Sequence, residues 1–245
     1  MAKEESGIER AARLIGRAGR IYVLTSDGLS QDSGLAPLMD ETKLWQGHKP
    51  SWLARRATFE KHPDLVWGWY CHRRQVVARH RPSAVHHALA EWEALYGRLV
   101  LVTDSVDGLH REAGQEGLNE ILGSIWHNKC TACRTVRVSR TQVYEGLPHS
   151  PCCRKLERPG VLWVDDEERR MRSFFSGPTS RRMEELGIFI GADVVTQVEL
   201  RCYFAWQWTI EIHEDAQAVK DALFLRGPPR AIVPQLFRMA AAFKR

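Results

Sequence analysis

The sequence predicts the α/β fold class: a Rossmann-like, mostly parallel sheet with one small module inserted into it. Short apolar segments of strand character alternate along the chain with segments whose apolar residues repeat at helical spacing. Residues 98–103 are continuously apolar in their middle, as a parallel strand buried on both faces would be. Residues 126–160 break the alternation. We therefore expect one domain over residues 1–245, with a module at 126–160 inserted within it.

The expected elements follow in chain order. Residues 8–15 have apolar side chains at helical spacing, and the β-rich run 20–25 ends in a Ser/Asp/Gly turn. Prolines at a first turn predict helices from Pro63 and from Pro82, and Gly97 is a suitable cap for the second. Helical spacing predicts its buried face as Val85, Ala88, Leu89, Trp92, Leu95 and Tyr96. Further predicted elements are strands at 98–103, 161–164, 187–191 and 208–212 and a helix from Pro234.

Composition is that of an ordinary globular protein, with 44% hydrophobic and 27% charged residues. No run approaches the ~18 apolar residues of a membrane helix, and the polar N-terminus lacks the apolar core of a secretory signal. We expect a cytoplasmic protein with no membrane partner. The net charge is +5, and basic residues are densest at residues 168–172 together with Arg181 and Arg182. A solvated arginine-rich loop explains that stretch better than a nucleic-acid interface.

Four of the six cysteines lie within one short stretch, which in a reducing compartment indicates a metal site. A structural zinc needs four ligands, and two C-x2-C knuckles commonly supply them. The predicted zinc ligands are Cys130, Cys133, Cys152 and Cys153. The third ligand of a regular pair of knuckles would fall at Ser150, so the fourth ligand is Cys152 or else His149. The alternative is a metal-free loop with reduced cysteines. Cys71 and Cys202 are predicted to be core residues.

Several motifs occur in a fixed order along the chain. Residues 101–110 read L-V-T-D-S-V-D-G-L-H, and residues 120–124 read E-I-L-G-S. They resemble T-Q-N-x-D-G-L-H and E-L-H-G-S of the sirtuins. Similar matches to that family occur at residues 25–35, 82–89, 158–163 and 187–191. The resemblance covers nearly the whole chain.

The resemblance to sirtuins implies a cleft between a Rossmann-like domain and a zinc module. NAD and an acylated lysine would enter this cleft from opposite sides, and the acyl group would pass to ADP-ribose. The cofactor-binding positions that it implies are Gly28, Ser105, Asp107 and Gly191. The segment around Trp69 also resembles the subgroup that removes succinyl and malonyl groups, where Tyr70 and Arg73 would bind the acyl carboxylate. An inherited pair that no longer meets a ligand is the alternative.

The departures from the family pattern concern its reacting residues. Leu122 stands where the family has its general base, a histidine, and loss of such a base costs about 10²–10⁴-fold in rate. Carboxylates stand at three positions along the expected cofactor path, namely Asp27, Asp104 and Asp193. A contact between like charges at ~5 Å costs about 3 kcal/mol at an effective dielectric of ~20, which makes NAD binding doubtful.

Three hypotheses follow for the function. The first is a sirtuin-fold pseudoenzyme that binds a protein, an acylated-lysine peptide or a small ligand without turnover. The second is an active NAD-dependent deacylase of the succinyl-removing type, in which other groups replace the lost ones. The third is a different enzyme that uses Asp27, Asp104, Asp107 and His110 to bind a cation or to move protons.

Overall fold

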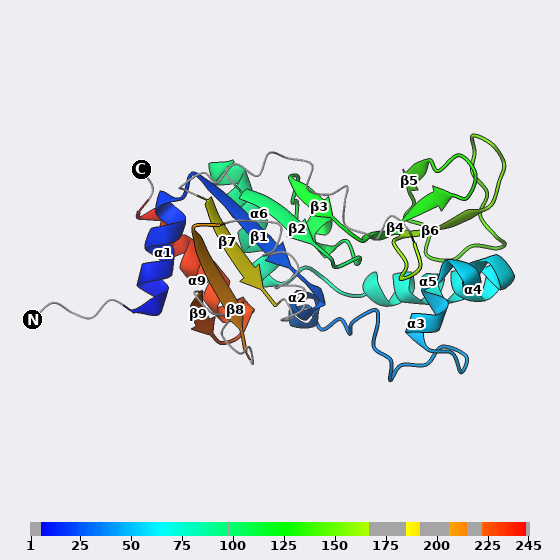
Figure 1. Cartoon of the computed structure of the whole chain (residues 1–245), viewed down its shortest axis with the longest axis horizontal. Helices are drawn as coiled ribbons and strands as arrows, with labels where there is room; N and C mark the ends of the chain where they lie inside the picture. Colours follow the sequence, from blue (N-terminus) through cyan, green and yellow to red (C-terminus); the bar gives the residue numbers. More distant parts are fainter. Residues whose placement is uncertain (1–5, 98, 167–184, 192–205, 215–221, 244–245) are drawn as a thin grey trace, which may run out of the picture.

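A six-stranded sheet forms the larger part of the computed structural model (Figure 1). The described residues are 6–97, 99–166, 185–191, 206–214 and 222–243. The strands of this sheet are β1 (Arg20–Thr25), β2 (Leu99–Thr103), β3 (Leu118–Glu120), β7 (Glu185–Ile190), β8 (Trp208–His213) and β9 (Leu223–Arg226). Their order is β3-β2-β1-β7-β8-β9, and every neighbouring pair is parallel.

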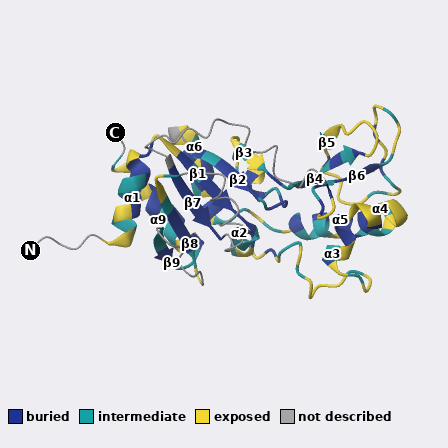
Figure 2. Ribbon diagram, in the orientation of Figure 1, coloured by how far each residue is buried: buried dark blue, intermediate teal, exposed yellow. Residues whose placement is uncertain are grey.

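Both faces of this sheet are buried, which explains why its strands lack polar alternation. Ile21 and Val23 of β1 join Leu101 of β2 in the core on one face. Leu24 of β1 and Val102 of β2 point to the other face and join a smaller cluster. The central strands β1, β2 and β7 therefore appear mostly dark blue in Figure 2.

Three helices cover the first face: α1 (Gly7–Arg17), α6 (Ala84–Tyr96) and α9 (Pro229–Ala241). α9 packs against both α1 and α6. Local signals start and stop these helices, since Ser6 and Glu9 form a capping box at α1 and Gly97 caps α6 at φ +61°.

The second part of the fold contains a small antiparallel sheet with the order β5-β4-β6. Its strands are β4 (Gly123–Cys130), β5 (Val136–Val138) and β6 (Glu157–Val161). The helices α3 (Pro50–Leu53), α4 (Arg56–Lys61) and α5 (Pro63–Val77) lie beside it, and α5 packs on β4 and β6 (Figure 1). Two short helices, α2 (Asp27–Asp32) and α7 (Leu109–Glu112), follow β1 and β2.

The structure confirms the α/β class and most of the expected elements. One prediction was wrong in kind: the strand expected at 161–164 is β6, which ends at Val161 and belongs to the antiparallel sheet. The last helix starts at Pro229 and contains Pro234 inside it. On α6, Leu95 is 62% exposed, because the buried face ends one turn earlier at Trp92. The strands β3 and β9 were not predicted from the sequence, because both are short strands at the edges of the sheet.

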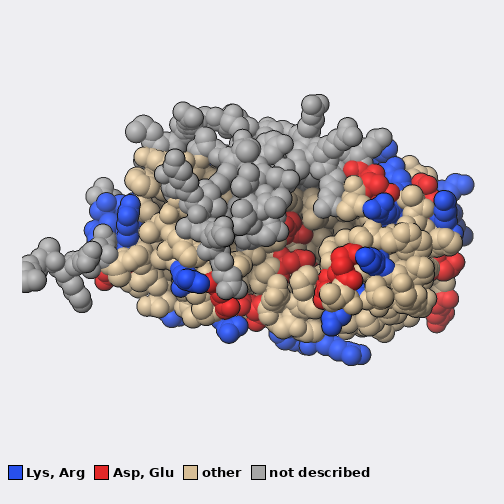
Figure 3. All heavy atoms as spheres, turned by 60° about the horizontal axis from the view of Figure 1, so that its bottom comes forward, with Lys and Arg blue, Asp and Glu red and all other residues tan. Residues whose placement is uncertain are grey.

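Cys71 is buried as expected, whereas Cys202 and the arginines of 168–172, 181 and 182 lie outside the described residues. Basic side chains occupy several separate places on the described part of the face in Figure 3. None of the helices within the described ranges combines the length and the apolar composition of a membrane span.

Candidate functional site

The candidate site lies at the carboxyl edge of the parallel sheet, where β1, β2 and β7 end side by side. β2 and β3 lie on one side of β1, and β7, β8 and β9 lie on its other side, so the direction in which strands are added changes at β1. Ligands of open α/β sheets bind outside the carboxyl ends at such a point. Asp27 and Gly28 follow β1, Asp104 and Ser105 follow β2, and Gly191 follows β7.

Two of the predicted cofactor positions are in direct contact. A Cβ atom on Gly28 would lie 2.2 Å from the carbonyl oxygen of Gly191, which itself has φ +61°. Only glycine at position 28 permits this approach of the two loops. The turns after β1 and β7 are thereby held together at the edge of the sheet.

The other two predicted cofactor positions share a hydrogen-bond network. The hydroxyls of Ser105 and Ser30 donate to Oδ2 of Asp107 at 2.7 Å and 2.6 Å, and the amide of Leu109 donates to Oδ1 at 2.8 Å. The indole of Trp126 donates to the Asp107 carbonyl at 2.7 Å. Asp107 is therefore a buried and fully engaged carboxylate that fixes the start of α7.

Two cavities open on either side of Asp27. The first, which we term the arginine cavity, is small and is lined by Asp27, Ser30, Arg73, Ser105 and Asp107 together with apolar side chains. The second, the tryptophan cavity, has a volume of about 70 Å³. Its lining includes Asp27, Tyr70, Asp104, Leu122 and Trp163, and the rest is apolar.

The predicted acyl-binding pair is divided between these cavities. Tyr70 lines the tryptophan cavity, and its hydroxyl accepts a hydrogen bond of 2.9 Å from the indole of Trp163. Burial raises the pKa of this phenol, so it stays neutral. Arg73 lines the arginine cavity and donates from Nη2 to the Ala36 carbonyl at 2.8 Å. Its Nε is buried without a hydrogen-bond partner.

The charges around Asp27 oppose one another. Burial raises the pKa of its carboxyl, and the neighbouring Asp107 carboxylate raises it further, whereas Ser105, the Leu38 backbone and Arg73 lower it. Burial likewise lowers the pKa of Arg73, against the attraction of Asp27 and Asp107. Asp27 is therefore easier to protonate than a free carboxyl, and a cation lies beside it.

No imidazole lines the tryptophan cavity among the described residues, although Leu122 does. His110 is 2% exposed and shares a hydrogen bond of 2.9 Å with the hydroxyl of Thr25. His127 lies on β4, with its Cβ against Gly160. Asp104 lines the cavity and accepts a hydrogen bond from Ser26 at 3.1 Å. Asp193 lies outside the described residues.

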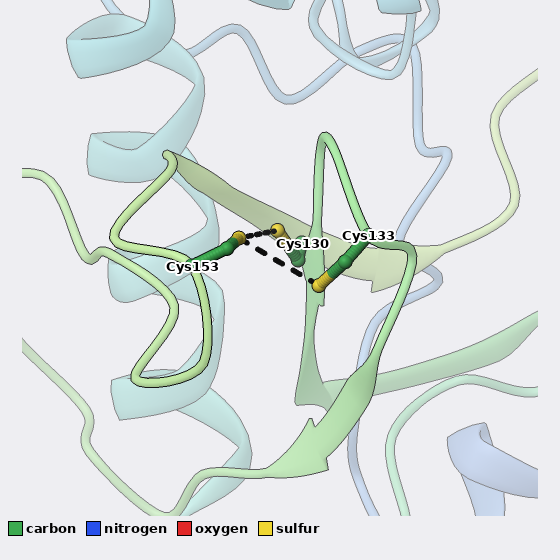
Figure 4. Close-up of side chains that lie close together, drawn as sticks. All are labelled: Cys130, Cys133 and Cys153. Carbon is green, nitrogen blue, oxygen red and sulfur yellow. Dashed lines mark hydrogen bonds between the residues drawn. The ribbon is translucent and has the colours of Figure 1, made fainter.

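Figure 4 shows Cys130 at the end of β4 close to Cys133 and Cys153, which lie in turns of the small sheet. Sγ of Cys153 is 3.3 Å from that of Cys130 and 3.7 Å from that of Cys133. A tetrahedral zinc with Zn–S bonds of ~2.3 Å separates its sulfurs by roughly 3.8 Å, so the three thiols fit zinc. Cys152 is 3.0 Å from Cys133, and hydrogen bonds with Cys152 and Thr135 lower the pKa of Cys133 to about 6.

Cys130, Cys133 and Cys153 are the one set within the described ranges whose ligand atoms all lie close enough together for a metal, and the predicted ligand Cys152 is not part of it. Within the same ranges, neither His149 nor the acidic residues of the cleft form such a group. The structure thus offers no ready cation site for the third hypothesis among these residues.

The sequence alone did not single out Ser30 and Trp163. Ser30 stands one helical turn after Asp27, and this spacing could have placed both at one site. Trp163 belongs to a motif without an assigned role, and only the tertiary contact with Tyr70 shows its place.

The comparisons with known proteins agree with this architecture. The model of the Sir2 family matches residues 27–197. A curated relative, NAD-dependent protein deacylase 1 of Caldanaerobacter subterraneus subsp. tengcongensis, is 33% identical over 71% of this chain and 72% of its own length. The NAD-dependent protein deacylase of Leptospira interrogans serovar copenhageni is 29% identical over 89% of this chain and 92% of its own.

The fold also matches solved structures over almost its whole length. A crystal structure of a Sir2 homolog–NAD complex superposes with a TM-score of 0.78 at 27% identity, over 96% of this chain and 94% of the other. Sequence motifs, sheet topology, the cysteine group and these similarities agree. The chain belongs to the Sir2 family.

Proposed function

We propose that this chain binds NAD and an acylated lysine of a protein in the cleft at the carboxyl edge of the sheet, and that it transfers the acyl group very slowly or not at all. The first half rests on membership of the Sir2 family, whose curated relatives here are named NAD-dependent protein deacylases. The second half rests on one observation, which is that Leu122 lines the tryptophan cavity.

The surroundings of Asp27 reduce the repulsion expected between this carboxylate and NAD. Asp27 has a raised pKa and lies beside Arg73, and Asp104 accepts a hydrogen bond from Ser26. The neighbouring Arg73 cation offsets part of the charge that Asp27 would present to a diphosphate. Gly28, Ser105, Asp107 and Gly191 would hold the cofactor at the glycine contact and the serine hydroxyls. NAD would supply the ADP-ribose that accepts the acyl group.

The loss of the base limits what this chain's own residues do in the cleft. A leucine side chain excludes water but accepts no proton, so it cannot activate a ribose hydroxyl. Tyr70 stays neutral and is engaged with Trp163, which leaves it a positioning role in the cavity wall. These residues orient and desolvate an acyl-lysine better than they catalyse its reaction.

The test restores the missing base. We expect Leu122→His to raise single-turnover, NAD-dependent loss of acetyl from a lysine peptide by roughly 10²-fold or more over the wild type. Leu122→Gln, which is of similar size but cannot act as a base at neutral pH, should leave the rate unchanged. NAD should bind both variants and the wild type in calorimetric titration of the zinc-loaded protein.

A second candidate function is retained deacylation, and one observation favours it. Asp104 lines the same cavity as Leu122, and a carboxylate can serve as a general base. Wild-type turnover equal to that of Leu122→His, with a large loss in Asp104→Asn, would establish this function in place of the first. Absence of heat with NAD up to millimolar concentration would show that the cofactor part of the proposal is wrong.

A further inference from the structure

We propose that Asp27 determines the acyl specificity of this cleft, selecting lysines with short uncharged acyl groups and rejecting acyl groups that end in a carboxylate. This inference rests on the proposed binding of acyl-lysine. It runs against the sequence pattern, since the pair Tyr70 and Arg73 predicts a preference for succinyl and malonyl groups.

Arg73 lies outside the wall of the tryptophan cavity. Tyr70 and Arg73 lie on one face of α5, one helical turn apart, yet they line different cavities. Arg73 binds the Ala36 carbonyl through Nη2, so its guanidinium is directed to the segment that follows α2. An acyl carboxylate in the tryptophan cavity would therefore not meet the planar fork that usually binds it.

Among the described residues, Asp27 is the one charged residue that lines both cavities. In the arginine cavity it lies with Arg73 and supplies that cation with a carboxylate from the protein itself. Each side chain favours the charged form of the other through charge attraction. Asp27 thus competes with any acyl carboxylate for Arg73.

In the proposed complex the acyl group would lie in the tryptophan cavity. Its charged lining residues in the described ranges are Asp27 and Asp104, and no lysine or arginine is among them. The remaining wall is apolar or aromatic, and the volume of about 70 Å³ suits a group of a few heavy atoms. A carboxylate would lose its hydration there and meet two like charges, whereas an acetyl group would lose neither.

Asp27 would therefore set specificity in two ways, by attracting Arg73 and by repelling an acyl carboxylate. Asp27 removes the favourable partner of an acyl carboxylate and adds an unfavourable neighbour. Substitution of this one residue should therefore change the choice between acyl groups more than it changes the affinity for a neutral one.

The experiment measures binding, so that it does not depend on turnover. Calorimetry compares peptides of one sequence that carry acetyl-lysine, butyryl-lysine or succinyl-lysine, the last two having acyl chains of four carbons. The wild type should bind the butyryl peptide about tenfold or more tightly than the succinyl peptide. Asp27→Asn, which preserves shape, should raise succinyl affinity by about tenfold or more and change acetyl affinity by less than about threefold.

Two further variants make the result specific. Asp40→Asn removes another carboxylate that acts on Arg73 but lines neither cavity, and it should keep the wild-type preference. In the double variant Asp27→Asn with Arg73→Met, the part of the gain in succinyl affinity that comes from Arg73 should disappear, and the part that comes from the removed repulsion should remain. Circular dichroism confirms that each variant is folded.

Other outcomes overturn the inference in distinguishable ways. Tighter binding of succinyl than of butyryl peptide by the wild type, or an unchanged preference in Asp27→Asn, would refute the role of Asp27 while leaving acyl-lysine binding intact. Failure of all three peptides to bind either protein would refute the proposed function and this inference together.

Discussion

Arg74 is a fully buried cation whose hydrogen-bond partners in the structure are neutral. Its guanidinium donates to Ile125 O at 2.6 Å, Thr141 O at 2.7 Å, Asn128 Oδ1 at 2.9 Å and Tyr144 Oη at 3.1 Å. It also lies 5.4 Å from the ring of Trp67 and 5.8 Å from that of Trp126, within the range of cation–π attraction. One side chain of α5 thereby holds β4 and the loop that follows β5.

We predict that Arg74→Met lowers the free energy of unfolding by about 3 kcal/mol or more, because it leaves several buried acceptors without donors. Urea unfolding followed by circular dichroism measures the loss. Arg79→Met, an exposed position just beyond the same helix, should change the stability by less than about 0.5 kcal/mol. Equal effects of the two substitutions would show that the Arg74 contacts contribute little.

At the scale of elements, the small sheet depends on its turns. Cys130 ends β4, Cys133 lies in the turn toward β5, and Cys153 lies in the turn before β6. A bound metal would fix these turns relative to one another and add to the stability of the small sheet. We propose that residues 126–160 act as a zinc module with Cys152 as the fourth ligand, since its sulfur is 3.0 Å from that of Cys133.

The proposed zinc site predicts which substitutions remove or weaken zinc binding and which do not. The purified chain should contain one zinc ion by atomic absorption, and Cys130→Ser or Cys153→Ser should remove it. Cys152→Ala should weaken zinc binding by about tenfold or more, in a competition with a chelator, whereas His149→Ala should not. The reverse ordering would make His149 the fourth ligand, and full retention of structure after chelation would favour the metal-free alternative.

At the scale of the whole molecule, two buried histidines join elements distant in sequence. His86 of α6 packs on His110 of α7 with ring centroids 4.5 Å apart, and His110 reaches Thr25 at the end of β1. Burial lowers the pKa of His86 to about 4, against the attraction of Asp107, and lowers that of His110 well below its ordinary value. Both imidazoles are therefore neutral in the folded protein.

The lowered pKa values of these two histidines make the folded protein less stable at acidic pH. Between pH 6.5 and about 4 the unfolded chain binds protons at these positions and the folded chain does not, so stability falls as the pH is lowered. The His86 pKa change corresponds to roughly 3 kcal/mol over this window. We expect urea midpoints to fall from pH 7 to pH 5, and to fall less in His86→Gln than in His87→Gln, an exposed neighbour. The same fall in both variants would contradict the assignment to His86.

Much of the fold could be predicted because it depends on local pattern. The strands at 20–25 and 98–103, the helix from Pro63 and the cysteine cluster follow from apolar periodicity, proline position and spacing. The prediction of a strand at 161–164 in the parallel sheet was wrong because that placement depends on distant pairing and not on local pattern. The apolar residues of this strand fit either sheet, and only pairing with β4 places β6 in the antiparallel one.

The site divides in the same way. The sequence by itself determined which residues lie at the carboxyl edge of the sheet, because parallel strands that end together bring the residues after them together. The resemblance to sirtuins places Leu122 where that family has a histidine, and a leucine side chain accepts no proton. Helical spacing suggested that Tyr70 and Arg73 act together. Only the tertiary structure decided otherwise, because the Ala36 carbonyl, Asp27 and the Trp163 indole come from distant segments and direct the two side chains into separate cavities.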